Sequence, residues 1–315
     1  MYIKLQKNLL KKFSMKEPID QLSWSEFFKN SKNRKKIPKK VERYNRLIAY
    51  SKNFFVISGY GAFTPGYMLI ISKEFIPAYG LIKREEKDEL NFIITQLKDL
   101  IRNEFNRKSV VFEHGMCACI GGLDRAHLHV MSLSIDSNEK SITQAINDTL
   151  YERKAGIKHI MYNNYKLENI HDINQIYENF KKENSRENIK IFGKIYKLKD
   201  VQNLNQNEWP FTTLKHIQKG GHYVYFRSDY LNSSFLTTNN FQTQFGRQVV
   251  YNNEIKLDKK FRIRMDKKNI NEIWRWQNSM FEENILETMR IAKVGLEKLK
   301  KKFIEQHKKF EIKIC

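Results

Sequence analysis

The chain has 315 residues, 41% of them hydrophobic and 13% aromatic, with 13 glycines and 5 prolines, and this composition excludes a wholly disordered, collagen-like or linker-dominated protein. Lysine and arginine total 57 against 35 acidic residues, and the resulting net charge of +22 favours polyanionic partners. No run approaches the roughly 18 consecutive apolar residues of a membrane-spanning helix, and no apolar leader precedes a cleavage-like site, so we expect a cytoplasmic protein with no membrane partner.

Residues 1–43 are expected to form a basic N-terminal leader. The stretch 29–43 holds eight basic side chains and one acid, is interrupted by Pro38, and shows no apolar face at helical spacing. Such a stretch could contact the phosphates of RNA or DNA. The alternative is that the charge reflects a lysine- and asparagine-rich composition spread over solvated faces.

Two β-rich runs, residues 53–63 and 67–75, follow the leader and are separated by Thr64-Pro65-Gly66, which is a turn signal. They predict an antiparallel pair of strands. Residues 84–105 then predict an amphipathic helix. Its apolar residues recur at steps of three and four, at Leu90, Ile93, Ile94, Leu97, Ile101 and Phe105.

Two further strand-like runs, residues 109–114 and 126–133, are joined by a loop of small residues. Because the strands are short and only one helix separates the two pairs, the order favours the α+β class, with an antiparallel sheet and a helix packed on one face. The loop contains Cys117 and Cys119, and Cys315 brings the total to three. An odd number of cysteines argues against a disulfide framework.

The unit at residues 44–140 is followed by a mixed C-terminal extension, residues 141–315, with a less regular pattern. Residues 223–226 predict a short strand, and residues 279–310 predict one long amphipathic helix. We expect the extension to pack on the first unit. Other basic, asparagine-rich segments could be exposed loops or helices.

Arg125, His127 and His129 alternate with apolar residues in a predicted strand, so their side chains point to the same face. The other face carries Ala126, Leu128 and Val130. That apolar face suits packing against a helix, which favours the polar face as the wall of a cleft. Successive side chains on one face lie about 7 Å apart, so one phosphate chain could reach all three polar groups.

These groups suit chemistry at phosphorus. A neutral imidazole is basic near pH 7 and can attack phosphorus, forming a phosphoramidate that a second acceptor can resolve. Arg125 could hold phosphate oxygens bidentately. The pair Gly121 and Gly122 could bring backbone N–H groups to the same oxygens.

The same strand resembles the signature of the histidine triad (HIT) superfamily of nucleotide hydrolases and transferases. The signature alternates three histidines with apolar residues, and the run AHLHVM supplies the second and third as His127 and His129. The preceding runs GGLD and FEHG, and the strand-turn-strand FFVISGYGAFTPGYMLIISKEF, are similar to segments of larger family members. The resemblance implies a purine nucleotide pocket formed largely by this first strand pair, roughly Phe54 to Ile71.

The resemblance also implies that His127 attacks the α-phosphate of a nucleotide to give a covalent nucleotidyl-histidine, while His129 binds the phosphate. Water or another acceptor would resolve the intermediate, giving a hydrolase or a transferase that needs no cofactor and no metal. Two histidines that usually support the nucleophile in this family are replaced, by Arg125 and Tyr67, so we expect slower or redirected activity. Tyr67 can still support His127 by donating one hydrogen bond. His114 could supply a supporting imidazole or be an ordinary residue at the end of a strand.

Two C-terminal runs, QFGRQVV at 244–250 and residues 274–288, are similar to parts of larger HIT-like proteins. Trp274 and Trp276 lie two residues apart and could cover one face of a short strand or turn. We interpret Arg247 as a surface cation rather than a phosphate contact.

Two other functions remain open. Cys117, Cys119, His127 and His129 are all good zinc ligands, although a single residue between the cysteines is fewer than zinc knuckles use. The second alternative is a basic nucleic-acid-binding protein with a degenerate HIT site, or a hybrid in which a HIT-type site processes nucleotide-modified nucleic-acid ends. The base preference, the acceptor and the oligomeric state stay open.

Overall fold

The structure is a computed structural model of the chain. It describes residues 46–73, 79, 84–115, 126–152, 188–191, 194–197, 223–228, 234–237 and 244–315. Outside the described residues lie the predicted leader 1–43 and the loop residues Cys117, Cys119, Gly121, Gly122 and Arg125.

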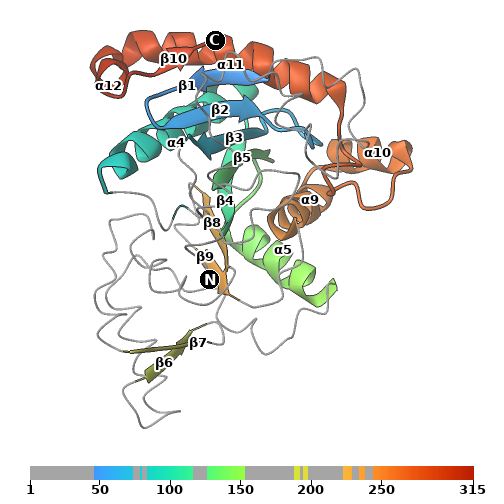
Figure 1. Ribbon diagram of the computed structural model, residues 1–315. Helices are drawn as coiled ribbons and strands as arrows, with labels where there is room; N and C mark the ends of the chain where they lie inside the picture. The colour runs from blue at the N-terminus through green and yellow to red at the C-terminus, as the bar shows by residue number, and fades with distance from the viewer. Residues whose placement is uncertain are drawn as a thin grey trace, which may run out of the picture.

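Eight strands form one antiparallel sheet in the described part of the chain (Figure 1). In spatial order they are β10 (Lys313–Ile314), β1 (Leu47–Tyr50), β2 (Phe54–Ser58), β3 (Met68–Ser72), β5 (His127–Leu133), β4 (Lys108–Gly115), β8 (Tyr223–Ser228) and β9 (Ser234–Thr237). A separate hairpin pairs β6 (Asn188–Ile191) with β7 (Lys194–Lys197). Helices pack on this sheet, so the predicted α+β class is confirmed.

Both predicted strand pairs form. The strands β2 and β3 pair with each other, and β4 pairs with β5 so that Phe112 lies opposite His129. The predicted amphipathic helix is α4 (Arg84–Phe105). The β2–β3 connection, residues 59–67, is longer than the predicted turn and includes Gly66 at a φ of 80°, which glycine adopts without strain.

Helix α4 packs against β4 and β5, and α11 (Glu282–Lys302) packs against α4, β1 and β2. Gly295 permits this close helix packing, because a Cβ there would overlap the side chain of Leu100. The Oγ1 of Thr288 accepts a hydrogen bond from the N–H of Gly66 at 2.8 Å. Helix α11 therefore also holds the turn between β2 and β3.

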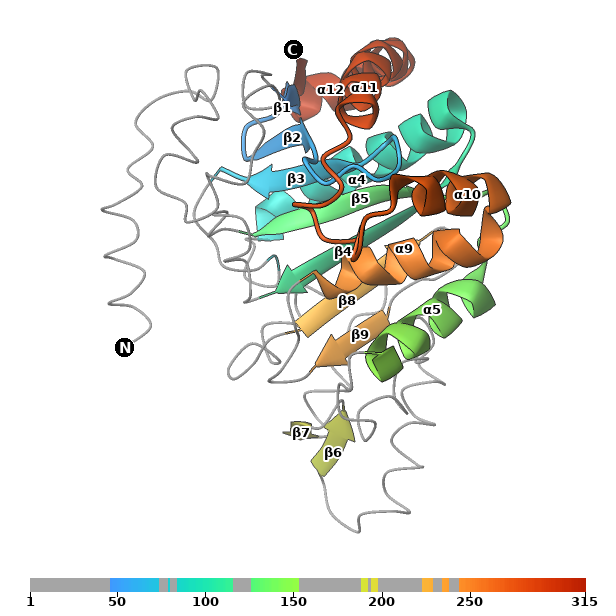
Figure 2. The ribbon, with the colours of Figure 1, turned by 90° about the vertical axis from the view of Figure 1, so that its right-hand side faces the viewer.

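Other helices cover the opposite face of the sheet (Figure 2). Helix α9 (Phe245–Leu257) packs against β4, β5 and β8, and both α5 (Glu139–Glu152) and α10 (Lys259–Lys268) pack on α9. The predicted helix packs on one face as α4, whereas the other face, which was expected to form the wall of a cleft, is covered by helices of the C-terminal extension. This is the face that carries His127 and His129.

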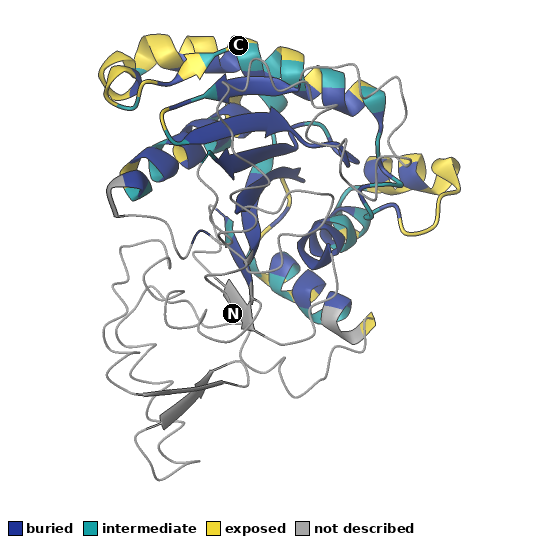
Figure 3. Ribbon diagram, viewed as in Figure 1, coloured by how far each residue is buried: buried dark blue, intermediate teal, exposed yellow. Residues whose placement is uncertain are grey.

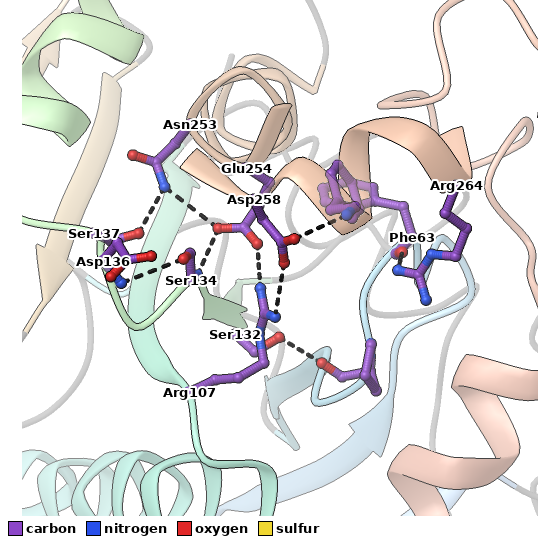
Figure 4. Close-up of polar contacts among 12 residues, drawn as sticks. Phe63, Arg107, Ser132, Ser134, Asp136, Ser137, Asn253, Glu254, Asp258 and Arg264 are labelled. Atoms are coloured by element: carbon purple, nitrogen blue, oxygen red, sulfur yellow. Dashed lines mark hydrogen bonds and ion pairs between the residues drawn. The ribbon is translucent and has the colours of Figure 1, made fainter. Parts of the chain in front are cut away.

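The sequence pattern did not indicate the role of α9, because residues 245–250 are buried without interruption and show no polar face. Further along α9, the buried carboxylate of Glu254 accepts a hydrogen bond from the N–H of Ser134 at 2.7 Å and pairs with Arg107 (Figure 4). Arg107 also pairs with Asp258 at 3.5 Å. Burial raises the pKa of Glu254, and the charge of Arg107 works against that rise.

The predicted helix over 279–310 is divided into two. Helix α11 ends at Lys302, the backbone of Phe303 is not helical, and α12 (Ile304–Lys309) follows before β10. The strand predicted at 223–226 is confirmed as β8. Strands β8, β9 and β10 extend the same sheet that β1 to β5 form, so the C-terminal segment contributes to one continuous core.

The side chains of β1, β2, β3 and β5 are almost all buried, and many of the exposed residues lie on α10, α11 and α12 (Figure 3). None of the described helices combines the length and apolar character that crossing a membrane requires.

Candidate functional site

Three histidine side chains gather on the sheet face that α9 covers. His127 and His129 are alternate residues of β5, and His114 lies on the same face of β4, two residues beyond Phe112, the residue opposite His129. The ring centroids of His127 and His129 are 4.9 Å apart, and those of His114 and His129 are 6.3 Å apart. His127 is 7% exposed and His129 is 9% exposed, so this face is buried instead of forming an open cleft wall. We call these three residues the histidine cluster.

His129 is the central ring of the cluster. Phe112 stacks on it with a centroid distance of 4.4 Å and an interplanar angle of 6°. On the side of β3, the hydroxyl of Tyr67 is hydrogen-bonded to the Nδ1 of His129 at 2.8 Å. Among the described residues, no group is hydrogen-bonded to the Nε2 of His129. One nitrogen of this ring is therefore fixed by the protein and the other is available.

The surroundings keep His129 neutral. Burial lowers the pKa of His129 well below its usual 6.5, and the neighbouring His127, His114 and Arg247 lower it further. Burial raises the pKa of Tyr67, although the charge of Arg247 works against that rise. At neutral pH a protonated phenol therefore faces a neutral imidazole.

His114 connects the cluster to α9. Its Nε2 accepts a hydrogen bond from the backbone N–H of Gly246 at 3.0 Å. This N–H lies in the first turn of the helix, where backbone donors have no partner within the helix. A Cβ at Gly246 would overlap the ring of Phe112, so only glycine allows this approach.

Arg247 follows Gly246 and is only 2% exposed. Its Nε donates to the carbonyl of Trp274 at 2.9 Å, and its Nη2 donates to the carbonyl of Gly61 at 2.6 Å and to the hydroxyl of Ser279 at 2.8 Å. The Nη1 has no hydrogen-bond partner, and no carboxylate among the described residues pairs with the guanidinium. The site thus contains a buried positive charge whose hydrogen-bond acceptors are all neutral oxygens.

The structure corrects and extends the sequence-based assignments. The interpretation of Arg247 as a surface cation is wrong, and the available signal was its position between the apolar residues Phe245 and Val249. Trp276 is buried, whereas Trp274 is half-buried. Tyr67, expected to support His127, is hydrogen-bonded to His129.

The predicted phosphate ligands Arg125, Gly121 and Gly122 lie outside the described residues. The same holds for Cys117 and Cys119, the cysteines of the zinc alternative. Within the described ranges, no group of three or more His, Cys, Asp or Glu side chains is placed to hold a metal ion.

Comparison with known proteins found no match: the chain fits no protein-family model, and no curated protein resembles it significantly. Any functional proposal for the chain therefore depends on the chemistry of the histidine cluster and of the groups around it.

Proposed function

We propose that the protein is a cytoplasmic nucleotidyl hydrolase or transferase of the HIT type, acting on a nucleoside phosphoanhydride or a related nucleotide. The observation that carries this proposal is the gathering of three imidazoles on one sheet face, with centroids 4.9 and 6.3 Å apart, beside the buried cation of Arg247. Neutral imidazoles can attack phosphorus and can also donate to its oxygens. A buried guanidinium that lacks a carboxylate partner favours an anionic substrate.

His127 is the proposed nucleophile. A nitrogen of its ring forms a bond to the α-phosphorus while the P–O bond to the leaving group breaks, and the leaving oxygen takes the electron pair. The enzyme then carries a nucleotidyl group on His127. Water or a second acceptor attacks the same phosphorus, the P–N bond breaks, and the free imidazole is restored.

The other residues would bind and orient the phosphate. His129 keeps its Nε2 available beside His127 and is the proposed ligand of a phosphate oxygen. Arg125 and the backbone of Gly121 and Gly122 are proposed to bind the remaining oxygens. His114, which Gly246 holds in place, supports the packing of the cluster.

Covalent labelling tests this proposal. Wild-type protein incubated with a dinucleoside polyphosphate labelled at the α-phosphate should retain an acid-labile label after denaturation, and the His127→Ala variant should retain none. His307→Ala is the matched control, because this buried histidine of α12 is hydrogen-bonded to Gln96 of α4, away from the cluster. Label that persists in His127→Ala would refute the assigned nucleophile. Wild-type protein that remains unlabelled by both purine and pyrimidine substrates would refute the proposed activity.

A second candidate function, binding of nucleic-acid ends, is favoured by the charge of α10. One acid accompanies its exposed cations, Lys259, Lys260, Arg262, Arg264, Lys267 and Lys268. Arg264 donates to the carbonyl of Phe63 at 3.3 Å, which places α10 beside the β2–β3 connection that supplies Tyr67 (Figure 4). A polyanion bound along α10 would therefore run close to the β2–β3 connection.

Charge removal tests this second function. One variant replaces four cations of α10 by glutamine, at Lys259, Lys260, Arg262 and Lys267. The control replaces four exposed lysines of the C-terminal helices, at Lys300, Lys301, Lys302 and Lys309. The first variant should bind single-stranded RNA more weakly and with a salt slope reduced by about 0.7 per lost phosphate contact, while free nucleotides are turned over as before. Equal losses in both variants would exclude α10 as a specific nucleic-acid surface.

A further inference from the structure

Arg247, Tyr67 and His129 form a chain of contacts that joins the C-terminal segment to the histidine cluster. The Cζ of Arg247 lies 5.1 Å from the ring centroid of Tyr67, and the hydroxyl of Tyr67 lies 2.8 Å from the Nδ1 of His129. All three side chains are buried. Tyr67 therefore lies between the guanidinium of Arg247 and the ring of His129 as a contact of both.

The guanidinium acts on Tyr67 through its charge and not through a hydrogen bond. An arginine offers five N–H donors and accepts none. The carbonyl of Trp274, the carbonyl of Gly61 and the hydroxyl of Ser279 take the donors of Nε and Nη2, and Nη1 has no partner. The guanidinium makes no hydrogen bond to the phenol of Tyr67, but its positive charge lies beside that ring and works against the rise that burial gives the pKa of Tyr67.

The direction of the Tyr67–His129 hydrogen bond follows from the charge of Arg247 and from the acceptors that the phenol hydrogen can reach. A phenol carries one hydrogen, and the positive charge of Arg247 beside the ring disfavours a hydrogen directed toward the guanidinium, so the hydrogen points to the Nδ1 of His129. The neutral ring of His129 must then carry its hydrogen on Nε2. In the opposite arrangement the phenol hydrogen of Tyr67 would need another acceptor, and no further hydrogen bond of this hydroxyl exists among the described residues.

We propose that Arg247 is a positioning residue that orients the hydroxyl of Tyr67 toward His129 and so holds His129 in its Nε2–H form. The consequence for catalysis rests on the proposed function: a ring in this form donates to a phosphate oxygen and has no lone pair at Nε2, which leaves nucleophilic attack to His127. The hydrogen position on His129 itself does not depend on the reaction.

Nitrogen NMR of the full chain with ring-labelled histidine tests the proposal, because protonated and unprotonated ring nitrogens have separate chemical shifts. The signals of His129 are assigned by their loss in a His129→Gln variant. In the wild type, Nδ1 should be unprotonated and Nε2 protonated. In Arg247→Met, the protonation should move to Nδ1 or become mixed. A wild-type His129 protonated at Nδ1 would overturn the proposal, and this outcome needs no variant to fold.

Two further variants distinguish a specific effect of Arg247 on the tautomer of His129 from a general loss of packing at the site. Ser279→Ala removes one hydrogen bond of Arg247 and should leave the tautomer of His129 unchanged, whereas Tyr67→Phe should make it mixed even though Arg247 is present. A folded Arg247→Met that keeps the wild-type tautomer would refute the role of Arg247, as would a Ser279→Ala variant that shifts the tautomer equally. If Arg247→Met does not fold, the wild-type and Tyr67→Phe spectra decide.

The labelling assay gives a separate result. Absence of a nucleotidyl-histidine together with an Nε2–H ring at His129 would refute the proposed function and leave the positioning role intact. A nucleotidyl-histidine at His127 together with an Nδ1–H ring at His129 would refute the positioning role and leave the proposed function intact.

Discussion

The Nε2 of His114 accepts a hydrogen bond from the backbone N–H of Gly246, a residue 132 positions later in the chain. This bond ties the end of β4 to the first turn of α9. Gly246 contacts Phe112, and Phe112 stacks on His129 at 4.4 Å. The start of α9, the aromatic ring and the histidine cluster therefore behave as one packed unit.

Substitution of Gly246 by alanine should disturb this unit. The added Cβ would overlap Phe112, and overpacking of a core commonly costs about 1–3 kcal/mol. We expect urea unfolding to show this loss and covalent nucleotide labelling to fall. Gly295→Ala is the control, because its Cβ would overlap Leu100 at the α4–α11 contact and leave the cluster untouched. Undiminished labelling in Gly246→Ala would show that the position of Phe112 does not matter to the site.

Replacement of Arg107 by methionine should destabilise the fold strongly, because the carboxylate of Glu254 would stay buried without its partner. Breaking a buried ion pair in this way costs roughly 3–5 kcal/mol. Arg102→Met is the matched control, since the pair of Arg102 with Asp99 is exposed and such pairs contribute about 1 kcal/mol or less. Denaturant titrations measure both effects. Equal losses in the two variants would mean that Arg107 contributes no more than a surface pair.

Substitution of Thr288 by valine should leave the N–H of Gly66 buried without an acceptor. The expected loss of unfolding free energy is about 1–3 kcal/mol. In Thr95→Val, an exposed threonine of α4 loses only a local hydrogen bond to Asn91, and we expect a change within about 0.5 kcal/mol. A stability change in Thr288→Val as small as that of the control would show that water accepts the hydrogen bond from the N–H of Gly66 in the variant.

Stability should fall as the pH drops below about 6.5. Burial lowers the pKa values of His129 and His307 in the folded chain, so the unfolded chain binds protons in a pH range where the folded chain does not. His129 alone can contribute a slope of up to about 1.4 kcal/mol per pH unit. The difference in unfolding free energy between wild type and His129→Gln should therefore shrink from pH 7.5 to pH 5.5. Taking this difference removes the opposite contribution of Glu254, whose pKa is raised. A difference independent of pH would contradict the neutral state of His129.

The sequence by itself determined the local elements. Period-two alternation placed the strands of β4 and β5 and put His127 and His129 on one face, and the steps of three and four from Leu90 to Phe105 matched α4. These features follow from the geometry of the backbone, which repeats over neighbouring residues. The same geometry explains why the half-buried helix α11 was visible in the sequence.

Only the tertiary structure decided that the histidine face is buried, that His114 joins the cluster, and that Arg247 lies beside Tyr67. Helix α9 covers this face, yet its first turns are buried on every side and carry no periodic pattern. Arg247 and Gly61 meet across 186 positions of the chain. No local rule of sequence spacing governs such a contact, because it depends on how the completed sheet and its helices pack around one core.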